Sequence, residues 1–133
     1  MVAQLTLAEA RDLMSSNPSA VLIDVRTEAE WNFVGVPVVD GSDSRLRFVQ
    51  WITFPGGSPN AEFVPTATTG LDQDQAVLFL CRSGARSQAA AEAFEAAGFT
   101  STHNIIEGFE GEKGPDGHRI GGWKHSGLEW TQG

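Results

Sequence analysis

The stretch of sequence that decides the fold is AVLFLCRSGARS, at residues 76–87. Its first part, 76–81, is a continuous apolar run that ends on Cys81, and such a run indicates a strand buried on both faces, as in a parallel sheet. The polar turn that follows contains Gly84, and the alanine-rich segment 87–97 after it is typical of a helix closed by a glycine. A buried strand, a tight turn and a helix in this order predict an α/β fold.

The rest of the chain repeats this alternation. Residues 20–25 and 102–106 are two more apolar runs of strand length, and a capping box from Thr6 to Glu9 opens a helix over 7–15. Weaker patterns predict short strands at 36–39 and 46–54, helices after 27–30, within 60–71 and from 122 onward, and a loop-like stretch from 108 to 122.

These elements predict an α/β fold with a mostly parallel central sheet of about five strands and helices on both faces. A chain of 133 residues suits one hydrophobic core, so we expect a single domain over residues 1–133. Its core would run from about residue 5 to about residue 130, with a glycine-rich excursion at about 110–122.

Composition narrows the function classes. The chain has 9 Lys and Arg against 17 Asp and Glu, a net charge of -8, which argues against a nucleic-acid partner or an acidic membrane surface. The apolar runs are too short to span a membrane, and the first residues lack the pattern of a signal peptide, so we expect a cytoplasmic protein. One cysteine and three scattered histidines predict no disulfide and no metal site, and the sequence has no Walker or dinucleotide glycine motif, so we expect no cofactor.

Cys81 has a setting that favours chemistry over inert burial. It ends a predicted strand, and a helix begins a few residues later, so successive backbone N–H groups and the positive end of the helix would surround its sulfur. Arg82 and Arg86 add two full positive charges. All three effects stabilise a thiolate, the form of cysteine that acts as a nucleophile. The plain alternative is a buried, unreactive cysteine at a strand end.

The segment around Cys81, together with two other segments, resembles a known family. The segment CRSGARS at 81–87 resembles the active-site loop of rhodanese-domain sulfurtransferases. Asp24-Val25-Arg26, followed by Glu30-Trp31, looks like the family's Asp-x-Arg segment with its Glu-aromatic pair, and NIIEGF at 104–109 resembles the segment after the last core strand. The resemblance implies a rhodanese-like fold and a cysteine that accepts a sulfane sulfur from a donor such as thiosulfate and passes it, as a persulfide, to cyanide or another thiophilic acceptor.

The resemblance also implies roles for individual residues. Cys81 would be the catalytic nucleophile, and the substrate would be bound by the rest of the loop: Arg82, Ser83, Gly84, Ala85, Arg86 and Ser87. The partners would be a small anionic sulfur donor and a thiophilic acceptor, which includes the case of a sulfur-acceptor protein. Asp24, Arg26 and Glu30 would act behind the site or as a structural ion-pair group, and we favour the structural role because Glu30 lies one helical turn from Arg26.

Two segments depart from the family pattern. Residues 34–38, VGVPV, keep a glycine and a proline but lack the histidine that commonly follows the Glu-aromatic pair. The glycine-rich stretch 110–122 is longer than the usual link to the final tryptophan, and it is either a lid beside the site or, the reading we favour, a surface excursion.

Three function classes remain open at this stage. The first is a thiosulfate-type sulfurtransferase, the second is a sulfur-relay or sensor module with a specific protein partner, and the third is a phosphatase or arsenate reductase of the same fold. The loop from Cys81 to Arg86 spans six residues, one fewer than in the phosphate- and arsenate-processing enzymes of similar fold. A loop that closes around one sulfur atom needs less room than one that holds three equatorial oxygens, so its length favours sulfur transfer.

Overall fold

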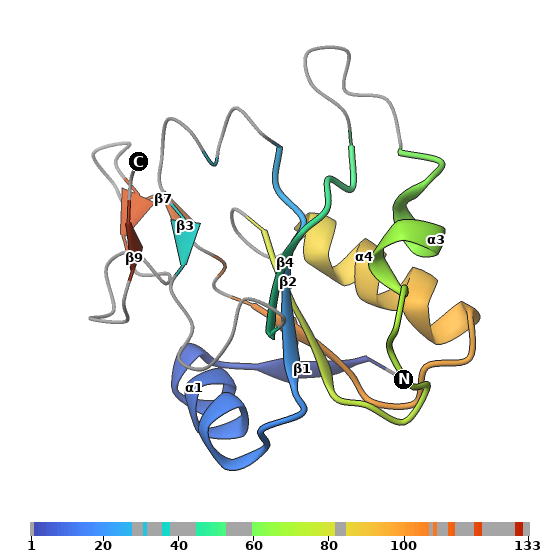
Figure 1. Ribbon diagram of the computed structural model, residues 1–133. Coiled ribbons are helices and arrows are strands. Elements are labelled where there is room, and N and C mark those ends of the chain that lie inside the picture. Colours follow the sequence, from blue (N-terminus) through green and yellow to red (C-terminus); the bar gives the residue numbers. More distant parts are fainter. Residues whose placement is uncertain are drawn as a thin grey trace.

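A computed structural model of the chain describes residues 2–27, 31, 36–37, 45–52, 60–81, 85–106, 108, 112–113, 119–120 and 130–131. Its centre is a parallel sheet with the strand order β1-β6-β5-β2-β4 (Figure 1). The strands of this sheet are β1 (Ala3–Leu5), β2 (Val21–Asp24), β4 (Leu46–Phe48), β5 (Val77–Leu80) and β6 (Thr102–Ile105). The five-stranded parallel sheet predicted from the sequence is therefore confirmed.

Helices cover both faces of the sheet (Figure 1). Helix α1 (Leu7–Ser16) packs on one face, in a cluster with Leu22 and Leu78, while α3 (Phe63–Ala67) and α4 (Ala85–Ala96) pack on the other, in a cluster with Ile23 and Phe79. Successive side chains of a strand point to opposite faces, so each of the two central strands contributes to both clusters. This is why β2 and β5 are buried at every position and appear in the sequence as continuous apolar runs.

Local chemistry sets the ends of the helices. The Thr6 hydroxyl accepts a hydrogen bond from the Glu9 N–H at 3.2 Å, and the Glu9 carboxylate accepts one from the Thr6 N–H at 2.9 Å, which is the predicted capping box. At the other end of α1, Arg45 donates to the carbonyl oxygens of Met14 and Asn17. Helix α4 is followed by Gly98, whose φ of 102° is a conformation that favours glycine.

The structure corrects several boundaries. Strand β1 was not predicted, because three residues with an exposed Gln4 give no usable periodicity. Of the described residues in the strand predicted at 46–54, which are 46–52, Leu46–Phe48 form β4 and pair with β2. Within 108–122, where a loop was expected, β7 (Glu112–Lys113) pairs antiparallel with β8 (Arg119–Ile120).

Another small sheet joins distant parts of the chain. Strand β3 (Val36–Pro37) pairs antiparallel with β9 (Trp130–Thr131), so the strand predicted at 36–39 exists in shortened form. The helices expected after 27–30 and from 122 onward, and the lid or surface role of 110–122, concern residues most of which lie outside the described part of the chain. Among the described residues, no helix has the length and apolar character needed to cross a membrane.

Candidate active site

Cys81 lies directly after β5, at the carboxyl end of the middle strand of the sheet. Ligands of parallel α/β sheets bind beyond this edge. Helix α4 begins four residues later, at Ala85, so its N-terminus is close in sequence to the thiol and carries partial positive charge. Only 1% of the cysteine surface is exposed, so the sulfur is shielded from bulk water.

Ser87 connects Cys81 to strand β6. The Ser87 hydroxyl oxygen lies 3.3 Å from the Cys81 sulfur and 2.5 Å from the side-chain oxygen of Asn104. Ser87 is fully buried on α4, and Asn104, on β6, is only 3% exposed. The Ser87 hydroxyl therefore lies against the thiol, and its second contact, with Asn104, brings together residues that are far apart in the sequence.

The contacts continue from Asn104 toward the surface. The Asn104 amide nitrogen donates to the side-chain oxygen of Gln4 at 2.9 Å, and the Gln4 amide nitrogen donates to Gln88 at 2.6 Å. The sequence analysis quoted Asn104 only as the first residue of the segment 104–109, with no role at the site, and did not single out Gln4. The one available signal was a polar side chain in the middle of the run 102–106, which was predicted to be buried.

The remaining residues of the predicted loop are only partly described. Arg86 is the second residue of α4 and is half-buried, and Ala85 is the first residue of that helix. Arg82, Ser83 and Gly84 lie outside the described residues, so their predicted roles stay predictions.

Asp24 and Arg26 form an ion pair at the end of β2. The Arg26 guanidinium donates to both carboxylate oxygens of Asp24, at 2.7 to 3.2 Å, and both side chains are fully buried. Asp24 is in register with Leu80, so its side chain lies on the α1 face of the sheet, whereas Cys81 belongs to the cluster on the α4 face. The pair therefore contacts the other side of the sheet from the thiol; Glu30 lies outside the described residues.

Within the described part of the chain, no group of three His, Cys, Asp or Glu side chains could hold a metal ion. His103 is on β6, where its Nε2 lies 3.0 Å from the Ser101 hydroxyl. Burial lowers the pKa of His103 below its usual value of 6.5, because the charged form is poorly solvated there. It is in register with Leu78, on the face away from Cys81, so it has no evident part in the chemistry of the thiol.

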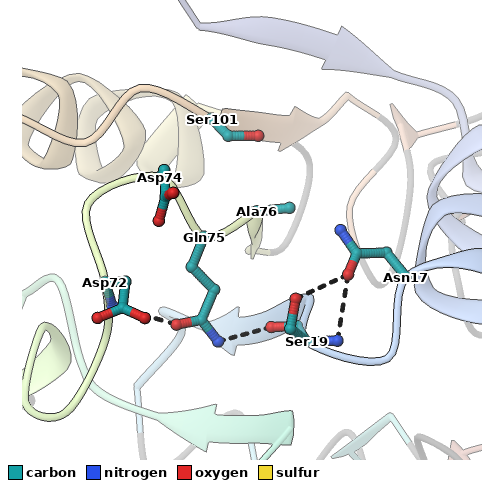
Figure 2. A pocket seen from close by; sticks show the side chains of 7 residues that line it. All are labelled: Asn17, Ser19, Asp72, Asp74, Gln75, Ala76 and Ser101. Carbon is teal, nitrogen blue, oxygen red and sulfur yellow. Dashed lines mark hydrogen bonds between the residues drawn. The ribbon is translucent and has the colours of Figure 1, made fainter.

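A separate polar pocket lies at the opposite edge of the sheet, where the strands begin (Figure 2). Its side chains bond one another and the backbone: Gln75 donates to the Ser19 carbonyl at 2.6 Å and accepts from the Asp72 N–H, and Asn17 accepts from Ser19. These bonds connect the turn before β2 to the turn before β5, which is a structural role.

The family assignment follows from comparison with known sequences. The family model described as "Rhodanese-like domain" matches residues 6–113, which is most of the chain. The chain belongs to the rhodanese-like domain family. The matched range contains β5, the loop after it and α4, so the candidate site lies inside the part that this rhodanese-like chain shares with its family.

Several known proteins are similar to this chain over most of its length. An uncharacterized protein of Rickettsia rickettsii is 36% identical over 92% of this chain and 91% of its own length. The crystal structure of Rv0390 from M. tuberculosis is similar with a TM-score of 0.90 and 42% identity, over 99% of this chain and 98% of that one. A polysulfide-sulfur transferase homodimer from Wolinella succinogenes is similar with a TM-score of 0.65 and 25% identity, over 99% of this chain and 80% of that one.

Proposed function

We propose that this rhodanese-like protein is a sulfurtransferase that moves a sulfane sulfur from thiosulfate, or a similar anionic donor, to cyanide or a thiol through a persulfide on Cys81. The observation that carries the proposal is the position of the chain's single cysteine, at the carboxyl end of β5 with α4 beginning four residues later. The likeness to a polysulfide-sulfur transferase supports sulfane sulfur as the group transferred.

The reaction consists of two displacements. The Cys81 thiolate attacks the outer sulfur of thiosulfate, a new sulfur–sulfur bond forms, and sulfite leaves with the electron pair of the bond that breaks. Cyanide then attacks the outer sulfur of the persulfide, thiocyanate leaves, and the electron pair returns to Cys81 as a thiolate. No oxidant or second thiol is needed, which suits a chain with one cysteine.

The surroundings of the thiol suit an anionic intermediate. The N-terminus of α4 favours negative charge near Cys81, and the Ser87 hydroxyl at 3.3 Å is a hydrogen-bond donor for the sulfur. We propose that Arg86, together with Arg82, binds the anionic donor, because a guanidinium matches the geometry of an oxyanion. Shielding the thiol from bulk water strengthens each of these interactions.

The test is the intact mass of the protein after thiosulfate treatment. We expect a gain of one sulfur atom, which cyanide removes with release of thiocyanate. Cys81→Ser should keep the fold, because the change is nearly isosteric, and should lose both the gain in mass and the thiocyanate. Sulfur transfer by Cys81→Ser would contradict the proposal, and so would a protein that never gains sulfur. A sulfur adduct that cyanide cannot remove would instead favour a sulfur-relay module, which passes its sulfur to a specific protein partner.

A matched pair of arginine variants tests donor binding. Arg86→Ala should raise the thiosulfate concentration needed for half-maximal rate by about tenfold, which corresponds to the loss of one charge-assisted hydrogen bond. Arg11→Ala removes the same charge from α1, where the side chain is 60% exposed, and should leave that concentration unchanged. Equal effects of the two substitutions would show that net charge, rather than contact at the site, governs binding.

A separate assay tests the phosphatase alternative. Cys81-dependent release of phosphate from an aryl phosphate, under the same conditions, would favour that alternative.

A further inference from the structure

The hydroxyl of Ser87 faces two acceptors but carries one hydrogen. Its oxygen is 3.3 Å from the Cys81 sulfur and 2.5 Å from the Asn104 side-chain oxygen. A hydroxyl donates one hydrogen bond, and an amide oxygen only accepts. When the hydrogen points to Asn104, Ser87 can accept from a Cys81 thiol but cannot donate to a thiolate.

Gln4 determines which atom of Asn104 faces Ser87. The Asn104 amide nitrogen donates to the Gln4 oxygen at 2.9 Å, and Gln4 is in turn held by its own bond to Gln88. The oxygen of the Asn104 amide is therefore directed toward Ser87. Because Asn104 is 3% exposed, water does not readily replace a hydrogen bond that this oxygen loses.

We propose that Asn104 is a positioning residue that competes with the Cys81 thiolate for the hydroxyl hydrogen of Ser87. The inference rests on the proposed function in one respect, that Cys81 is the nucleophile. When the thiol ionises, its proton leaves to water or buffer, and the Ser87 hydroxyl turns from Asn104 to the sulfur. An amide does not take up a proton near neutral pH, so Asn104 holds the hydroxyl rather than relaying the proton.

The competition distinguishes the two states of the proposed cycle. In the free enzyme with an ionised thiol, the negative charge is on the Cys81 sulfur, which accepts the hydrogen bond from the Ser87 hydroxyl. In the persulfide the charge is on the outer sulfur, and the hydroxyl returns to Asn104. Asn104 therefore disfavours the unloaded thiolate relative to the loaded enzyme, which favours uptake of sulfur from the donor.

The charged groups on the elements around Cys81 are the same in every variant used to test the proposal. The elements packed against β5 carry Asp24 and Arg26 at the end of β2, Arg86, Glu92 and Glu95 on α4, and His103 on β6. Each remains in place in every variant below, so differences between variants report the hydrogen bond rather than a changed field.

The experiment is the rate of alkylation of Cys81 by iodoacetamide as a function of pH. The chain has no other cysteine, so the signal comes from one site. Asn104→Leu removes the competing acceptor at similar volume, and we expect the midpoint of the profile to fall by about 0.5 to 1 pH unit. Thr102→Val is the matched control: Thr102 is on the same face of β6 and 2% exposed, and its hydroxyl has no hydrogen-bond partner among the described residues, so the midpoint should not move.

Two further variants make the result decisive. In a Ser87→Ala background, Asn104→Leu should have no effect on the midpoint, because the shared hydrogen is gone. Gln4→Met, at an exposed position that does not endanger folding, frees the Asn104 amide to turn its nitrogen toward Ser87 and should lower the midpoint in the same direction.

An unchanged or higher midpoint in both Asn104→Leu and Gln4→Met, or a full shift that persists without Ser87, would overturn the proposal. If Asn104→Leu does not fold, Gln4→Met decides by itself. The measurement does not use sulfur transfer, so it separates this inference from the proposed function: a protein without sulfurtransferase activity can still show the shift, and an active one can lack it.

Discussion

Replacing Asp24 by Asn tests whether the buried ion pair is structural. The substitution keeps the shape of the side chain but removes a negative charge that is bonded to Arg26, whose side chain has 0% exposure. Removing one partner of a buried ion pair commonly costs about 3–5 kcal/mol, because the other charge loses a close counter-charge in a poorly solvated place. The three side-chain hydrogen bonds from Arg26 to Asp24, at 2.7 to 3.2 Å, place this pair among the well-formed cases.

The assay is equilibrium unfolding in urea. With a denaturant slope of about 2 kcal/mol per molar, a loss of about 3 kcal/mol lowers the midpoint by about 1.5 M. Asp12→Asn is the matched control, since Asp12 is 80% exposed, lies 3.9 Å from Arg11, and should change the free energy of unfolding by less than about 0.5 kcal/mol.

The result that refutes the reasoning is a free energy of unfolding that changes by less than about 1 kcal/mol in Asp24→Asn. If sulfur transfer were lost at the same time, the pair would serve the reaction and not the stability of the sheet. If stability falls as expected, the rate should be measured well below the urea midpoint, where the variant is folded. The location of the pair on the α1 face predicts that folded Asp24→Asn protein retains most of its activity.

Two other predictions concern helix ends. The Thr6 N–H bonded to the Glu9 carboxylate holds the pKa of Glu9 below its usual 4.5, so the stability it contributes is present above the unfolded pKa and is lost as pH falls through the lower folded value. Glu9→Gln should therefore be less stable than the unchanged protein at pH 7, and a thermal-unfolding series should show the difference shrinking below pH 4.5; a difference that grows in acid would contradict the capping role. Gly98→Ala places a side chain at φ 102°, 2.6 Å from the Gln73 amide nitrogen, and should lower the free energy of unfolding by about 1–3 kcal/mol. Gly70→Ala, at φ 75°, places its side chain at an ordinary contact distance of 4.0 Å from the Arg47 guanidinium and should lose less in the same urea titration; the reverse order would show that the contact with Gln73 is unimportant.

Short-range patterns in the sequence were enough to predict the central elements. The run 76–81 appears as β5, the capping box from Thr6 to Glu9 begins α1, and Gly98 follows α4 with positive φ. Burial on both faces, hydrogen bonding within one turn and the conformational range of glycine are local requirements that the residues themselves express. Elements with little such signal, β1 above all, were missed, because strands of two or three residues form through their partners rather than through their own periodicity.

The candidate site also has one part that local sequence predicted and another part that depends on tertiary structure. The sequence by itself determined that Cys81 ends a buried strand and that Ser87 follows on the next helix, because both lie in one strand–turn–helix unit. Only the tertiary structure decided that Asn104 and Gln4 complete the chain of hydrogen bonds, 100 residues apart in sequence. The physical reason is strand order: β6 pairs with β5 on one side and with β1 on the other, so side chains from distant segments meet on one face of the sheet where α4 covers it.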